Sequence, residues 1–96
     1  MTLREIIGNL DDLSNDLVIF AEKNSDWLLD SPAALVLASE MERAGTQLEV
    51  LLYFLEIEIA KEVLGVWSKW RDGRKPTEAE RIEALFYYAD NDAYLG

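Results

Sequence analysis

Apolar residues recur three or four positions apart at the start of the chain: Leu3, Ile6, Ile7, Leu10 and Leu13. This spacing is typical of an amphipathic helix. Thr2 precedes the pattern, and Glu5 follows three positions later, as in a capping box at a helix start. The pattern therefore predicts a short helix from about Leu3 to Asp11.

Two short apolar runs follow, and both are typical of strands. Residues Leu17 to Glu22 are rich in β-branched and aromatic side chains, and Ala33 to Ala38 form a second run after Pro32. The intervening connection is too long for a tight hairpin and suits a surface loop. We expect an antiparallel pair of strands, with Trp27 of the loop folded back over the sheet.

The segment from Gln47 to about Arg71 is apolar-rich and predicts one long helix. Its first half, Val50 to Ile57, is apolar on nearly every side, which indicates a helix that is covered from several directions or that meets a second subunit. A competing interpretation stays open, because residues 55–59 alternate between apolar and acidic as in a half-buried strand. The residues from Leu48 to Ile59 are either all helix or include a third strand.

A last helix is predicted from about Glu78 to Ala89, after a turn over Asp72 to Pro76. We find no repeat or linker that would separate a second domain, so residues 1–96 are expected to form one domain. The predicted fold class is α+β: a short N-terminal helix, two short antiparallel strands and two C-terminal helices packed on the sheet.

Composition narrows the chemistry more than it narrows the fold. The chain has no cysteine and no histidine, which removes thiolate chemistry, the commonest general base and the commonest transition-metal ligand. We expect no zinc site, no catalytic triad and no cofactor.

Charge is the most pronounced global property of this sequence. Nineteen acidic residues against nine basic ones give a formal net charge of −10, which repels nucleic acid and anionic lipid and attracts basic proteins. The N-terminal residues contain no continuous apolar stretch, and no segment approaches the roughly 18 apolar residues of a membrane span. We therefore expect a cytoplasmic location, with no nucleic-acid and no membrane partner.

Glutamates raise the question of a metal-dependent enzyme. Glu58 and Glu62 lie one turn apart on the predicted helix, and Glu56 or Glu49 is a candidate third ligand. Such pairs are common on solvated helix faces, here with Lys61 between them. We expect no metal and no catalysis.

Carboxylates in the predicted loops are the candidate partner contacts, since loops often carry function. They are Asp11, Asp12, Asp16, Asp26 and Asp30. Trp27 lies among them as a candidate aromatic anchor.

Charge is inverted locally between Lys69 and Lys75, where four basic residues stand against Asp72. The first two of these cations suit a helix C-terminus. Arg74 and Lys75 remain, and they mark a candidate anion-binding or docking turn.

Five segments of the chain resemble a family of small bacterial proteins of unknown function: Leu3 to Leu10, Leu17 to Glu22, Asp30 to Ala33, Phe54 to Leu64 and Tyr87 to Ala93. The resemblance spans most of the chain and implies a bacterial, cytoplasmic, non-enzymatic protein. It assigns no residue a role.

Our leading hypothesis is a non-catalytic acidic module, such as an inhibitor, immunity or regulatory protein, that binds a basic protein partner. The alternative is a small homo-oligomer with a structural or assembly role, and a homodimer through the predicted helix around Val50 to Ile57 is expected. A metal-dependent enzyme that uses the glutamates is the third hypothesis.

Overall fold

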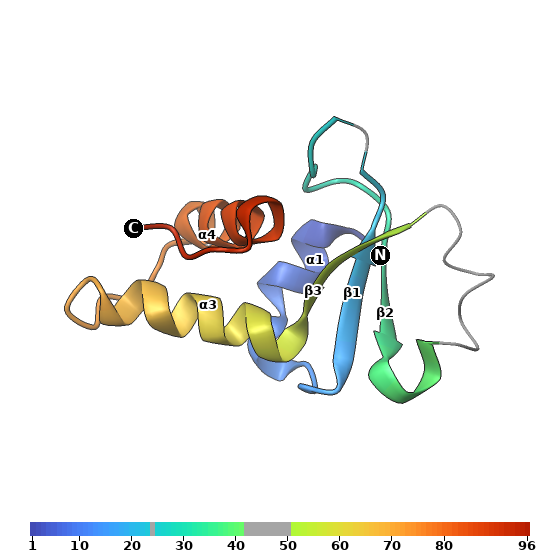
Figure 1. Cartoon of the computed structure of the whole chain (residues 1–96), viewed down its shortest axis with the longest axis horizontal. Coiled ribbons are helices and arrows are strands. Elements are labelled where there is room, and N and C mark those ends of the chain that lie inside the picture. Colours follow the sequence, from blue (N-terminus) through green and yellow to red (C-terminus); the bar gives the residue numbers. More distant parts are fainter. Residues whose placement is uncertain (24, 42–50) are drawn as a thin grey trace.

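The computed structural model describes residues 1–23, 25–41 and 51–96. The elements run in the order α1 (Leu3–Gly8), η1 (Leu10–Asp12), β1 (Leu17–Ala21), β2 (Ala33–Leu37), η2 (Ala38–Glu40), β3 (Leu52–Glu56), α3 (Ile57–Lys69) and α4 (Glu78–Asn91), where η marks a single 3₁₀ turn (Figure 1). This is the α+β class that the sequence predicts.

The sheet is antiparallel and has the order β2-β1-β3 among the described strands. Leu17 pairs with Leu37 at one end of the β1–β2 ladder, and Ala21 pairs with Ala33 at the other. Four of the five residues of β1 are buried, as expected for the central strand of a sheet. The LVIFA sequence matches this environment, because it offers an apolar side chain to each face.

The third strand corrects the prediction of one long helix from Gln47. Leu52–Glu56 is a strand that pairs with β1, and the helix begins only at Ile57. The side-chain pattern of Leu52–Glu56 fits a helix and a strand equally well. Pairing with β1 provides hydrogen-bond partners for its backbone N–H and C=O groups and so favours the strand. The interpretation with a third strand is therefore the correct one, while residues 47–50 lie outside the described part of the chain.

A β-bulge in β3 decides which of its side chains reach the core. Ile19 pairs with Leu55 and the next residue of β1, Phe20, pairs with Tyr53, so Phe54 is the extra residue on β3. Phe54 and Leu55 are consecutive, yet both are buried in the main core, whereas Tyr53 is half exposed. A regular strand would send these neighbours to opposite faces, so the bulge allows both to pack inward.

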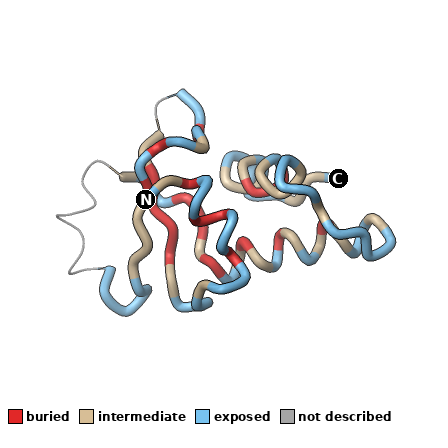
Figure 2. Tube along the Cα trace, turned by 180° about the vertical axis from the view of Figure 1, so that it is seen from behind, coloured by how far each residue is buried: buried red, intermediate tan, exposed pale blue. Residues whose placement is uncertain are grey.

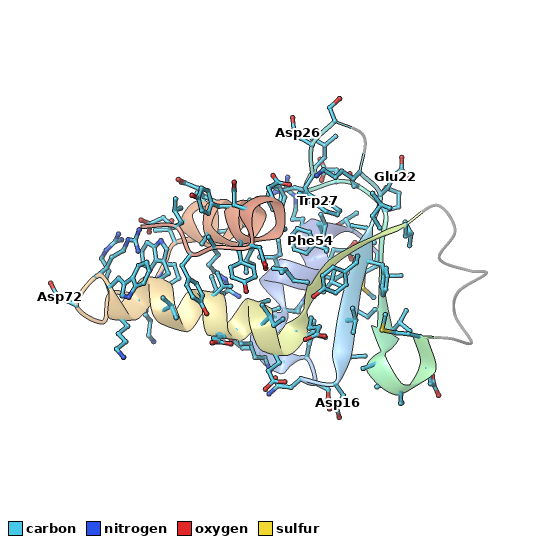
Figure 3. The ribbon with its side chains drawn as sticks, viewed as in Figure 1. Asp16, Glu22, Asp26, Trp27, Phe54 and Asp72 are labelled. Atoms are coloured by element: carbon cyan, nitrogen blue, oxygen red, sulfur yellow. The ribbon has the colours of Figure 1, made fainter. Side chains whose placement is uncertain are left out.

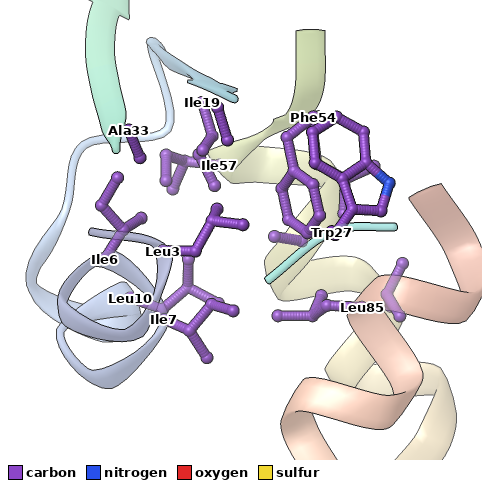
Figure 4. Close-up of a cluster of buried hydrophobic side chains, with 14 of the residues drawn as sticks. Leu3, Ile6, Ile7, Leu10, Ile19, Trp27, Ala33, Phe54, Ile57 and Leu85 are labelled. Atoms are coloured by element: carbon purple, nitrogen blue, oxygen red, sulfur yellow. The ribbon is translucent and has the colours of Figure 1, made fainter. Parts of the chain in front are cut away.

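The main core lies where α1, the sheet, α3 and α4 meet (Figures 2 and 4). Figure 4 shows α1 side chains beneath Ile19 and Ile57, with Leu85 of α4 near Trp27 and Phe54. The ring of Phe86 on α4 also packs edge to face on Phe54 of β3, with ring centroids 5.8 Å apart. Both C-terminal helices therefore share the core of the sheet.

Two capping boxes define the starts of α1 and α4. The Thr2 hydroxyl accepts from the backbone N–H of Glu5, while the Glu5 carboxylate accepts from the backbone N–H of Thr2. Thr77 and Glu80 repeat this arrangement at α4. Each box satisfies N–H groups that a helix start leaves unpaired.

Candidate functional site

The predicted contact carboxylates fall into two groups at opposite ends of the sheet. Asp11 and Asp12 belong to η1, and Asp16 precedes β1. Asp26 and Asp30 lie in the loop that leaves the other end of β1. Figure 3 shows Asp16 and Asp26 at the two extremes of the sheet, so these five residues do not form one surface.

Three further acids join the group that surrounds Asp16. The backbone N–H of Ala38 donates to the Asp16 carbonyl over 2.9 Å, which brings η2 and Glu40 to this end. Glu56 pairs with Val18 at the same end of β1. Glu58 lies in the first turn of α3, which begins directly after Glu56. We call this surface the acidic end, and its members are Asp11, Asp12, Asp16, Glu40, Glu56 and Glu58.

The carboxylates of the acidic end lack cationic partners. Within the described ranges none of them lies within 4.0 Å of a lysine or arginine nitrogen, and all except Glu56 are exposed. The nearby Lys61 ammonium instead donates to the Leu13 carbonyl (2.7 Å) and to Oδ1 of Asn15 (2.8 Å). Lys61 thus fixes the loop before β1.

At the opposite end one carboxylate is already paired. Asp30 accepts from Nε of Arg4 over 3.3 Å, and the same guanidinium lies 4.0 Å from Glu78. Asp26 is exposed, and no cation of the described residues pairs with it. This end therefore carries less unbalanced charge than the acidic end.

Trp27 is part of the core, as the fold-back prediction requires. Its side chain packs edge to face on Phe54 with ring centroids 4.9 Å apart, and the residue is only 6% exposed. The indole N–H donates to Asp90 over 3.0 Å, and the Lys23 ammonium donates to the same oxygen over 3.1 Å. Its ring is consequently not available as a surface anchor.

Arg74 is held by an ion pair. It makes two hydrogen bonds to the Glu80 carboxylate, of 3.0 and 2.8 Å, and its guanidinium lies 4.7 Å from the centre of the Trp67 ring. The hydrogen bonds from Arg74, with those from Thr77, lower the pKa of Glu80 to about 2. Of the two residues predicted for an anion-binding turn, only Lys75 is without a carboxylate partner within the described ranges.

Lys75 lines a surface depression of about 350 Å³ together with two cations that the sequence prediction missed, Lys61 and Arg81. The depression lies among η1, α3 and the entry to α4, and Asp11 also lines it. These residues come from separate segments, so no local motif marks them. The sequence carries no signal for this grouping, because Lys61 and Arg81 each follow a glutamate by three positions and fit ordinary charge pairs on a helix surface.

The two glutamates of α3 have different surroundings, since Glu58 belongs to the acidic end and Glu62 contacts Tyr94. The Glu62 carboxylate accepts a hydrogen bond of 3.1 Å from the Tyr94 hydroxyl. The pKa of Tyr94 is raised, mainly by desolvation and secondly by this hydrogen bond. The described residues contain no group of three or more acids, histidines or cysteines placed to hold a metal. Glu49, one candidate ligand, lies outside those residues.

The predicted dimer helix around Val50 to Ile57 is wrong as to its secondary structure. Among the strands that the structure describes, this segment forms β3 at one edge of the sheet, and Ile57 begins α3. Leu52 and Tyr53 are 53% and 47% exposed.

None of the helices described is both long enough and apolar enough to cross a membrane.

A family model described as "Domain of unknown function (DUF7716)" matches residues 1–96. Comparison of the chain with curated proteins and with solved structures gives no match. The family model confirms the resemblance to a family of proteins of unknown function over the whole sequence, and the chain belongs to the DUF7716 family.

Proposed function

We propose that this protein is a cytoplasmic, non-catalytic binding module whose acidic end engages a basic protein partner. The observation that supports the proposal is the gathering of unpaired carboxylates on η1, η2, the turn before β1 and the start of α3. Like charges held together raise the free energy of the folded state. A cationic partner would relieve that repulsion.

The charge also favours fast association. A strongly acidic surface steers cationic proteins toward it, and salt screens the attraction because the Debye length falls from about 10 Å at 0.1 M to 3 Å at 1 M. The proposal therefore requires an association rate that decreases as ionic strength rises.

An apolar depression beside the acidic end supports a protein ligand. It has a volume of about 340 Å³, and Ile6, Leu13 and Leu35 contribute to its lining together with the carboxylate-bearing Glu5 and Asp12. Such a surface suits an apolar side chain flanked by lysine or arginine. The partner we propose thus presents basic residues around an apolar anchor.

Charge reversal at the acidic end tests the proposal. The wild-type chain and the triple variant Asp11→Lys, Asp12→Lys, Asp16→Lys are immobilised, and bound proteins are identified by mass spectrometry. We expect a basic protein to bind the wild type, to elute with salt and to be lost from the triple variant. Association rates measured with that protein should fall with both salt and charge reversal.

Asp26→Lys is the matched control, because it makes the same change per residue at the opposite end of the sheet. It should retain the partner. Equal retention by wild type and triple variant, or equal loss in the control, would contradict the assignment to the acidic end.

A homo-oligomer is the second candidate, and the exposed edge of β3 favours it. Among the described residues β3 pairs only with β1, and Leu52 and Tyr53 remain exposed on it. An unpaired strand edge can pair with a second copy of itself. We propose that a dimer, if formed, uses this edge.

A further inference from the structure

We propose that the depression lined by Lys61, Lys75 and Arg81 binds a small phosphate monoester. This inference does not rest on the proposed protein-binding function, although the depression shares Asp11 with the acidic end. It rests on where the structure places the unpaired cations of a chain that is otherwise strongly acidic.

Most described cations outside this depression have identified electrostatic partners. Arg4, Lys23 and Arg74 make ion pairs, and Arg71 donates to the carbonyls of Trp67 and Gly96. Lys61, Lys75 and Arg81 have no carboxylate within 4.0 Å among the residues the structure describes, and the Lys61 ammonium donates to the neutral oxygens of Leu13 and Asn15 instead. The three nevertheless converge on one depression.

Arg81 is anchored by one hydrogen bond between two helices. Its Nη2 donates to the Ile7 carbonyl over 2.9 Å, which holds the guanidinium between α1 and α4. Its Nε is buried and has no acceptor in the described part of the chain. The positive charge of the Arg81 guanidinium therefore has only a neutral carbonyl as a partner among the described residues, and an oxyanion would neutralise that charge.

The other lining groups indicate the kind of anion. Ser68 offers a hydroxyl, and Leu64 and Pro76 offer apolar surface beside the cations. A volume of about 350 Å³ is at the small end of ligand pockets, which run from about 300 to 1,000 Å³. A phosphate with a small organic group uses both the charged and the apolar lining.

Asp11 is the one negatively charged residue among the described residues that line the depression, so its removal should affect phosphate binding in the opposite direction to the removal of a cation. Its carboxylate lines the same depression and leaves the lining with three positive charges and one negative charge. A bound phosphate would be repelled by Asp11 and attracted by Lys75. Removal of these two charges should accordingly change affinity in opposite directions.

The experiment is a titration of ¹⁵N-labelled protein with phenyl phosphate and, separately, with inorganic phosphate, at ionic strength kept constant with sodium chloride. We expect saturable shifts of the amide signals of Ser68 and Lys75, with phenyl phosphate binding more tightly than inorganic phosphate. Lys75→Ala should weaken binding about tenfold, the equivalent of one charge-assisted hydrogen bond. Asp11→Asn should strengthen it.

Lys69→Ala is the matched control, since Lys69 is an exposed lysine of α3 that does not line the depression. The affinity of the Lys69→Ala variant for phenyl phosphate should equal that of the wild type. Three outcomes would overturn the site. They are an absence of saturable shifts, an equal loss of phosphate affinity in Lys69→Ala and Lys75→Ala, and a lower phosphate affinity in Asp11→Asn. Tighter binding of inorganic phosphate than of phenyl phosphate would overturn the assignment to an ester. Because this titration contains no protein partner, its result is separate from that of the charge-reversal capture.

Discussion

The indole N–H of Trp27 donates a hydrogen bond of 3.0 Å to Oδ1 of Asp90, and this bond joins the loop after β1 to the end of α4. The two residues are far apart in sequence, and the bond is partly buried. It allows a large aromatic side chain to enter the core without leaving its polar atom unpaired.

Removal of the Asp90 acceptor should destabilise the protein. Asp90→Ala leaves the Trp27 N–H unpaired and also removes the partner of Lys23, so we expect the free energy of unfolding to fall by about 1–3 kcal/mol. Asp90→Asn keeps a carbonyl acceptor and should cost less. Urea denaturation followed by tryptophan fluorescence measures both. Glu83→Ala, an exposed acid on the same helix, is the control, and an equal loss there would show that the Trp27 bond is not the cause.

Phe54 should be much more sensitive to truncation than its neighbour Tyr53. Phe54 is 1% exposed and contacts the rings of both Trp27 and Phe86, so Phe54→Ala should cost about 3–5 kcal/mol. Tyr53 is half exposed, and its ring packs on that of Phe20 across the strands, which predicts about 1 kcal/mol or less for Tyr53→Ala. Denaturant midpoints of the two variants check this. Phe54→Leu provides a measurable value if the alanine variant fails to fold, and losses no larger than that of Tyr53→Ala would disprove the role of the bulge.

The Arg74–Glu80 pair should make the free energy of unfolding depend on pH below about 4.5. The folded pKa of Glu80 is lowered from 4.5 to about 2, so the unfolded chain binds more protons between these values. The contribution is therefore fully present above pH 4.5 and is lost as the pH falls toward 2. NMR titration of the Glu80 carboxyl should give a midpoint near 2, and Arg74→Ala should raise it. An unchanged midpoint in Arg74→Ala would contradict the assigned cause.

Neutralisation at the acidic end should stabilise the fold while it weakens partner binding. Asp16 lies among unpaired carboxylates, so Asp16→Asn should raise the free energy of unfolding by about 0.2–0.5 kcal/mol at low ionic strength. The gain should shrink in 1 M salt because the Debye length falls to about 3 Å. Thermal denaturation at two salt concentrations checks it. Asp26→Asn should raise the free energy of unfolding by less than Asp16→Asn does. A lower free energy of unfolding in Asp16→Asn would mean that the Asp16 carboxylate has a favourable native contact.

A dimer through the β3 edge should be sensitive to a charge on that edge. Tyr53→Lys should shift the protein to monomer, because lysine on an edge strand opposes pairing with another chain. Sedimentation velocity across micromolar concentrations measures the change. Leu37→Lys introduces the same charge at an exposed position of β2, on the other edge of the sheet, and should leave the association state unchanged. A wild-type monomer throughout that range would remove this candidate.

Local interactions made several elements predictable from the sequence alone. Thr2 with Glu5 marks the start of α1 in the sequence, since a capping box forms between residues three positions apart, and the structure shows the same box between Thr77 and Glu80 at α4. The runs at Leu17–Ala21 and Ala33–Leu37 are strands within one residue of their predicted limits. The net charge of the chain likewise follows from composition.

Tertiary structure decided what local pattern left ambiguous. Leu52–Glu56 fits both a helix and a strand locally, and pairing with β1 selects the strand. The bulge at Phe54 exists only against that partner. The acidic end and the cluster of Lys61, Lys75 and Arg81 arise in the same way, because each collects residues from separate segments that are close together only after the chain has packed. Sequence spacing carries information about neighbours along one element, whereas a surface depends on how the elements pack.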